Sequence, residues 1–128
     1  MDAPHSPLHV IVGEDDAEMR RLVVQALRRD GYEVGEAADG TTLLELLRDR
    51  ATRGERTDLV ISNIRMPGCT GLQVLERLRT ADDRVPVILM TAFGDDETRA
   101  LAERRGAMLF DKPFLLDDLR KAVGHLLT

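Results

Sequence analysis

The sequence predicts a single α/β domain in which about five parallel strands form one sheet with helices on both faces. Two observations predict this fold class. Short apolar runs rich in Val, Ile and Leu alternate with longer segments in which apolar residues recur at spacings of three and four. The chain has 128 residues, 43% of them hydrophobic and 32% charged, which is typical of one globular domain.

The first half of the chain contains two strand–helix units and a third strand. After a tail formed by residues 1–7, which we expect to be flexible, residues 8–13 are a continuous apolar run that is too short for a helix and typical of a buried parallel strand. A helix follows, with an apolar face formed by Met19, Leu22, Val23, Ala26 and Leu27. The pattern then repeats, with a strand at 33–37, a helix at 41–53 and a strand at 58–62.

The second half continues the same alternation. Residues 71–80 have leucines in helical register, and residues 85–91 are an apolar strand. Residues 95–105 are helical in composition but weakly amphipathic, which predicts a helix held lightly on the surface, and residues 107–110 form a short strand. The closing helix has two aspartates in its first turn and an apolar face formed by Leu116, Leu119, Val123 and Leu126.

Composition and charge exclude several classes of protein. Cys69 is the only cysteine, so neither an intramolecular disulfide nor a cysteine-built zinc site is expected. No apolar run approaches the roughly 18 residues that span a bilayer, and the acidic, proline-bearing start does not resemble a signal peptide. The formal net charge of −5, with basic residues interspersed among acids, argues against direct nucleic-acid binding. We therefore expect a cytoplasmic protein with no membrane contact.

Polar residues follow four of the predicted strands. In a parallel sheet, ligands bind beyond the carboxyl ends of the strands, so these positions are the candidate site: Glu14-Asp15-Asp16, Ser62-Asn63, Thr91 and Lys112. Adjacent carboxylates are ligands of the kind that Mg²⁺ prefers. They also favour helix capping, with Asp15 as N-cap and Glu18 as its capping-box partner, and both interpretations stay open.

Four segments of the sequence resemble the receiver domain of two-component response regulators. They are VGEDD, LVISNIRMPGCTGL, VPVILMTAFG and DKPF, and they follow one another in the family's order along essentially the whole chain. The resemblance implies that residues 8–128 form one receiver domain. It also implies a flavodoxin-like, doubly wound sheet of five parallel strands.

The resemblance assigns a role to several strand-end residues. In the family, an acidic pair holds Mg²⁺ together with a backbone carbonyl, which here correspond to Glu14, Asp15 and the carbonyl of Arg65. A hydroxyl contacts the phosphoryl group and a lysine pairs with it, and these correspond to Thr91 and Lys112. The peptide bond that follows Lys112 is expected to be cis.

One residue departs from the family at the phosphoacceptor position, where Asn63 stands in place of an aspartate. A neutral amide oxygen is a poor nucleophile, so we expect no phosphorylation at the usual position. The loss of a carboxylate should weaken or abolish Mg²⁺ binding, with the Asn63 oxygen as a weak remaining ligand. In the less crowded pocket, the Lys112 ammonium can donate a hydrogen bond to the Asn63 carbonyl oxygen. Ser62 is a far weaker candidate acceptor.

A second departure lies at Leu109, a switch position where the family usually has an aromatic or histidine side chain. Leucine has no polar tip with which to report a change at Thr91, so coupling to the last strand is in doubt. Two explanations of Asn63 stay open: a natural receiver that is not phosphorylated, or an engineered Asp to Asn change. The second departure at Leu109 favours the natural variant.

The sequence therefore predicts a signalling and interaction module without enzymatic turnover. A histidine kinase, a phosphorelay protein or an output domain is the expected partner, and a homodimer through the face from Asp95 to Leu127 is a further hypothesis. The alternative is a phosphatase or phosphotransferase of the haloacid dehalogenase type, which also places carboxylates, a threonine and a lysine at strand ends. That alternative fits less well, because Glu14 stands where those enzymes have a nucleophilic aspartate.

Overall fold

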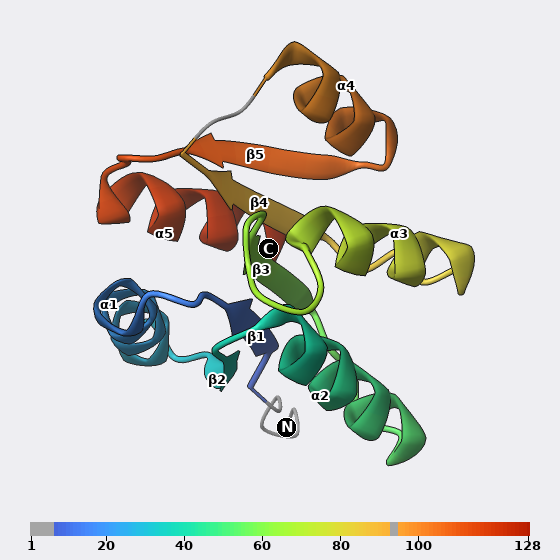
Figure 1. Ribbon diagram of the computed structural model, residues 1–128. Coiled ribbons are helices and arrows are strands. Elements are labelled where there is room, and N and C mark those ends of the chain that lie inside the picture. Colours follow the sequence, from blue (N-terminus) through green and yellow to red (C-terminus); the bar gives the residue numbers. More distant parts are fainter. Residues whose placement is uncertain (1–6, 93–94) are drawn as a thin grey trace.

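The computed structural model describes residues 7–92 and 95–128, in which five strands and five helices alternate (Figure 1). The strands are β1 (His9–Gly13), β2 (Glu33–Ala37), β3 (Leu59–Asn63), β4 (Val87–Thr91) and β5 (Ala107–Asp111). The helices are α1 (Ala17–Arg29), α2 (Gly40–Thr52), α3 (Gly71–Thr80), α4 (Asp96–Arg104) and α5 (Leu116–Leu126). The predicted alternation is confirmed. The predicted flexible tail lies, except for Pro7, outside the described residues.

The strands form one parallel sheet in the order β2-β1-β3-β4-β5, which is the doubly wound, flavodoxin-like arrangement. Its two faces bury separate apolar clusters. One lies under α1 and α5 and includes Val12, Ile61 and Met90, while the other lies under α2, α3 and α4 and includes Ile11 and Leu89. The chain order reverses between β1 and β3, and such a reversal places a crevice at the carboxyl ends of these strands.

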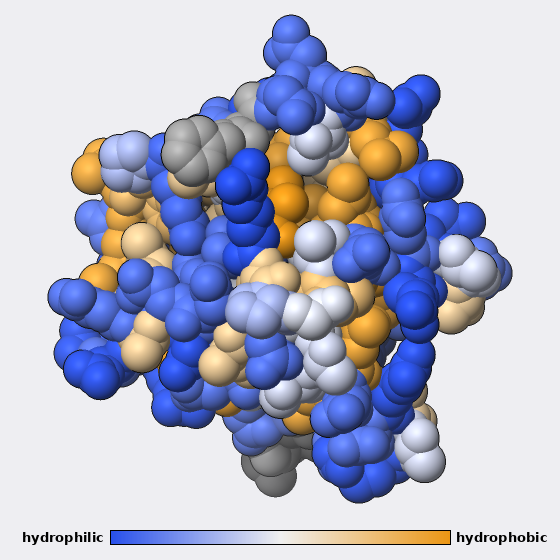
Figure 2. Space-filling view, in the orientation of Figure 1, coloured by the Kyte–Doolittle hydropathy of each residue, from blue (hydrophilic) through white to orange (hydrophobic). Residues whose placement is uncertain are grey.

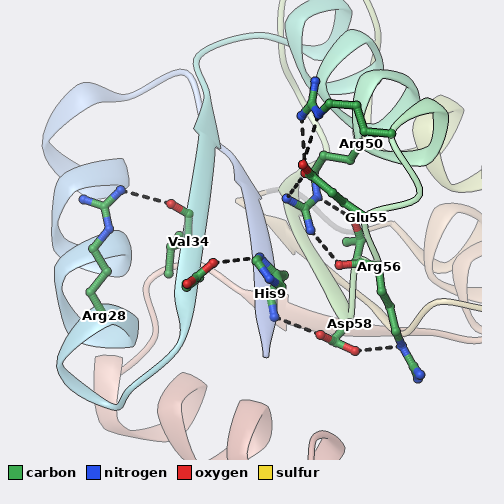
Figure 3. Close-up of polar contacts among 10 residues, drawn as sticks. His9, Arg28, Val34, Arg50, Glu55, Arg56 and Asp58 are labelled. Carbon is green, nitrogen blue, oxygen red and sulfur yellow. Dashed lines mark hydrogen bonds and ion pairs between the residues drawn. The ribbon is translucent and has the colours of Figure 1, made fainter. Parts of the chain in front are cut away.

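Polar contacts fix the opposite end of the sheet, where β1 and β3 begin (Figure 3). The guanidinium of Arg50, on α2, is buried and donates to the Arg56 carbonyl at 2.6 Å and to the Glu55 carboxylate at 3.1 Å. Asp58 accepts a hydrogen bond from the backbone N–H of His9 at 2.8 Å. These contacts tie the loop before β3 to α2 and β1, and so fix the position of the first residues of β3.

The start of α1 corrects one prediction from the sequence. Asp16, not Asp15, is the N-cap, and its carboxylate accepts from the backbone N–H of Met19 at 3.0 Å. The proposed capping box between Asp15 and Glu18 is therefore wrong. The physical reason is that the Asp15 carboxylate accepts a hydrogen bond from the side chain of Asn63, 48 residues along the chain.

The face of the molecule in Figure 2 is mostly hydrophilic, with apolar side chains reaching the surface in separate patches. In α4, Ala102 is the one buried residue among those described. No helix in the described part of the chain has the length and apolar character needed to cross a membrane.

Candidate functional site

Residues at the end of β3 and β4, or directly after β1 and β5, meet at the carboxyl edge of the sheet. The strands end nearly level, because Gly13 pairs with Ser62, Asn63 with Met90 and Thr91 with Asp111. As a result, the structure gathers the residues predicted from the sequence, with Glu14, Asn63 and Thr91 buried and Asp15 and Lys112 beside them. The peptide bond between Lys112 and Pro113 is cis, as the resemblance implied.

The Asn63 side chain connects two loops. Its amide nitrogen Nδ2 donates to Oδ1 of Asp15 at 3.0 Å and to the backbone carbonyl of Arg65 at 2.8 Å. Both partners are pure acceptors, so the NH₂ group, and not the amide oxygen, must face them. The two hydrogens of one NH₂ group thereby join the loop after β1 to the loop after β3.

Lys112 pairs with Glu14 rather than with Asn63. Its ammonium nitrogen Nζ lies 2.6 Å from Oε1 of Glu14, a fully buried carboxylate whose Oε2 accepts from the backbone N–H of Asp16 at 3.2 Å. The prediction that Lys112 donates to the amide oxygen of Asn63 is therefore wrong. A compact ammonium is drawn to the buried negative charge in preference to a neutral oxygen, because a charged acceptor makes the stronger hydrogen bond.

The two adjacent carboxyl groups differ in pKa. Burial raises the pKa of Glu14 above its ordinary value of 4.5, although the hydrogen bond from Lys112 works in the opposite direction. Desolvation also acts to raise the pKa of Asp15, but hydrogen bonds with Glu14 and Asn63 outweigh it and leave that pKa below its ordinary value. The more exposed Asp15 therefore holds its negative charge more readily than Glu14.

Leu109, the predicted switch position, packs against the core. Leu109 is half-buried on β5 and packs against the apolar cluster under α2, α3 and α4. The next residue, Phe110, lies on the other face of the sheet, where its ring meets that of Phe114 edge to face with centroids 5.6 Å apart. The alternation along the strand thus gives Leu109 an apolar environment that suits leucine.

Ser62 faces away from the strand-end cluster. Its hydroxyl is buried, donates to the carbonyl oxygen of Asn63 at 3.0 Å and lies 3.9 Å from the sulfur of Met66. The placement follows from alternation along β3, which directs neighbouring side chains to opposite faces. This geometry gives no support to Ser62 as a phosphate acceptor.

Two residues that support the site were not singled out from the sequence. Arg20, on α1, donates to the backbone carbonyl of Glu14 at 2.8 Å and to the carboxylate of Glu36 at 3.1 Å, and so holds the loop after β1. Gly71 begins α3 so close to β3 that a Cβ atom there would lie 2.4 Å from the carbonyl oxygen of Asn63. Neither role leaves a local signal, because each depends on a partner from another element.

The oxygen atoms of the site do not fit a magnesium ion in this arrangement. Mg²⁺ needs oxygen ligands at about 2.0–2.1 Å in near-octahedral geometry. Here the Asp15 carboxylate and the Arg65 carbonyl both face the NH₂ group of Asn63, and Glu14 is paired with Lys112. Within residues 7–92 and 95–128, no group of three or more His, Cys, Asp and Glu side chains is placed to hold a metal.

Comparison with known proteins identifies the family. Residues 10–124 match the model of the response regulator receiver domain. The chain is 31% identical over 119 residues to sporulation initiation phosphotransferase F of Bacillus subtilis, covering 92% of each chain. It is 37% identical over 121 residues to regulatory protein AtoC of Escherichia coli, but this match covers 92% of the chain and only 25% of that relative.

Solved structures agree with this assignment. The receiver domain of Francisella response regulator 1452 has a TM-score of 0.83 and 25% sequence identity, with 94% of this chain and 96% of that chain covered. The haloacid dehalogenase alternative gains no support from these matches. The strand order, the residues gathered at the strand ends and the family match over residues 10–124 all agree. The chain belongs to the response regulator receiver domain family of two-component systems.

Proposed function

We propose that this receiver has Asn63 at its phosphoacceptor position, is not phosphorylated there, and acts as a signalling and interaction module. One observation carries the proposal: a neutral carboxamide stands where Asp15, the Arg65 carbonyl and the end of β3 converge. An aspartate in that place could attack phosphorus as an anion, whereas the Asn63 oxygen lacks the charge and its lone pairs are delocalised into the C–N bond. We expect no enzymatic turnover.

The remaining residues hold the site in a state that needs no phosphoryl group. Lys112, the candidate partner of a phosphoryl oxygen, is paired with Glu14 at 2.6 Å, and Thr91 is buried at the end of β4. A bound Mg²⁺ would supply positive charge for phosphoryl transfer. With Asn63 in place of a carboxylate, we infer that Mg²⁺ binding is weakened or absent.

The surface formed by α4, β5 and α5 is the proposed partner face. Arg99 on α4 donates two hydrogen bonds to the carboxylate of Asp111, at 2.8 and 2.9 Å, and so ties this lightly attached helix to β5. Met108 is exposed on the same edge strand, where it can contribute to an apolar contact. A histidine kinase, a phosphorelay protein, an output domain or a second copy of the chain is the expected partner.

The experiment is a measurement of intact mass after incubation with Mg²⁺ and acetyl phosphate, for the chain as it stands and for Asn63→Asp. We expect only Asn63→Asp to gain the mass of a phosphoryl group. That result would locate the block at Asn63 alone and favour an engineered or recently silenced receiver. If neither protein gains mass, the pocket has diverged further, which favours a natural interaction module. A phosphoryl group on the unchanged chain would contradict the proposal.

A further inference from the structure

The NH₂ group of Asn63 lies between two oxygen atoms that a cation could also bridge. Oδ1 of Asp15 and the carbonyl oxygen of Arg65 belong to different loops, and both are electron-rich acceptors. Brought together with nothing between them, they would repel each other. The NH₂ group of Asn63 places one partly positive hydrogen against each, at nitrogen–oxygen distances of 3.0 and 2.8 Å.

Each negative group of the site already has a partner from the chain itself. The buried Glu14 carboxylate receives the ammonium of Lys112 and the backbone N–H of Asp16. Asp15 receives the Asn63 amide. An entering divalent cation would have to displace the Asn63 amide from Asp15 and from the Arg65 carbonyl. Binding of the cation would therefore break two hydrogen bonds of the protein.

We propose that the Asn63 carboxamide substitutes for a divalent cation and joins the loops after β1 and β3 without a metal. This inference rests on the proposed function, in which Asn63 stands at the acceptor position. It goes further, because it assigns Asn63 a positive structural role: Asn63 is a positioning residue that holds Asp15 and the Arg65 carbonyl. The stability of the chain is then independent of Mg²⁺, and Asn63→Asp makes it dependent on Mg²⁺.

The test is thermal unfolding of the full chain and of Asn63→Asp, each in EDTA and in MgCl₂. For the unchanged chain we expect the Tm to differ by about 1 °C or less between the two conditions. Asn63→Asp should unfold at a lower Tm in EDTA, because it replaces two hydrogen bonds by a third carboxylate. Mg²⁺ at 100 times its Kd should then raise that Tm by roughly 10 °C. The inference is overturned if Mg²⁺ raises the Tm of the unchanged chain, or if Asn63→Asp is as stable in EDTA as the unchanged chain.

A second measurement needs no variant. Asn63 is the only asparagine in the chain, so its side-chain NH₂ gives a single asparagine pair in an amide NMR spectrum. This pair should keep its position during a MgCl₂ titration. A saturable shift would mean that the amide gives way to the ion, which would overturn the inference even if Asn63→Asp failed to fold.

A matched control separates the bridge from the added charge. Gln25→Glu changes the net charge by the same amount at an exposed position of α1. Its Tm should respond to Mg²⁺ no more than that of the unchanged chain, and a response equal to that of Asn63→Asp would overturn the inference. The proposed function is judged separately, by intact mass: a chain that binds Mg²⁺ yet takes no phosphoryl group contradicts only the inference.

Discussion

The pair formed by Lys112 and Glu14 gives a prediction whose size follows from the structure. Lys112→Met keeps most of the side-chain volume but leaves a fully buried carboxylate without its cation. Removal of one partner of a buried pair typically costs about 3–5 kcal/mol. Glu14 can limit this cost by taking up a proton. Protonation costs about 1.36 kcal/mol for each pH unit above the ordinary pKa of 4.5, which is about 3.4 kcal/mol at pH 7. Protonation therefore limits the charge-burial part of the loss to about 3.4 kcal/mol at pH 7.

The loss must therefore depend on pH. A carboxyl group whose pKa is raised in the folded state favours folding at low pH, and this contribution is lost as the pH rises through the folded pKa. The pKa of Glu14 is already raised by burial, and removal of Lys112 raises it further. At pH 5.5 neutralisation requires only about 1.4 kcal/mol, so the loss in Lys112→Met should shrink between pH 7 and pH 5.5, by at most about 2 kcal/mol.

The assay is urea unfolding followed by far-ultraviolet circular dichroism in EDTA, with the free energy of unfolding obtained by linear extrapolation. The matched control is the double variant Glu14→Gln/Lys112→Met, in which neither charge of this pair remains. Its difference from the unchanged chain should vary much less over this pH range. An equal loss for Lys112→Met at pH 5.5 and pH 7 would refute the reasoning.

Two further predictions concern packing and surface charge. Gly71→Ala should destabilise the fold by about 1–3 kcal/mol, because the new Cβ would lie 2.4 Å from the Asn63 carbonyl oxygen. Gly124→Ala, which has open space around it on α5, should instead stabilise the fold by about 0.5–1 kcal/mol. Urea unfolding of both variants checks this, and equal effects would contradict the account. Arg120 hydrogen-bonds to Asp30 and holds the pKa of that carboxyl below its ordinary value of 3.8. The pair therefore contributes stability above pH 3.8 and loses it as the pH falls through the lowered pKa. Arg120→Gln should lower the Tm at pH 7 by an amount that shrinks as the pH falls below 3.8, and a deficit that does not shrink would contradict this prediction.

The fold could be predicted from the sequence because its signal is local. Apolar runs, such as that in β4 (Val87–Thr91), and the helical spacing of leucines in α3 (Gly71–Thr80) are each complete within a few residues. The rule that strand ends meet at one edge then brought Glu14, Asn63 and Lys112 together correctly.

The pairings inside the site could not be predicted in the same way. Asp15 and Asp16 are equivalent as candidate caps, and only the distant Asn63 decides between them by engaging Asp15. Lys112 likewise has two candidate acceptors in the same crevice, the amide oxygen of Asn63 and the carboxylate of Glu14. It pairs with Glu14 because that carboxylate is buried, and burial is a property of the folded chain. The roles predicted for Thr91 and Leu109 remain predictions, since they concern a phosphorylated state.

The most direct test of the central claim, that this receiver does not respond to a phosphoryl group, is an amide NMR titration with beryllofluoride and Mg²⁺. Beryllofluoride imitates a phosphoryl group on an aspartate without requiring chemistry at phosphorus. The account predicts no change in the unchanged chain for residues of α4, β5 and α5, and saturable shifts near the site in Asn63→Asp. Saturable shifts on α4, β5 and α5 in the unchanged chain would contradict it.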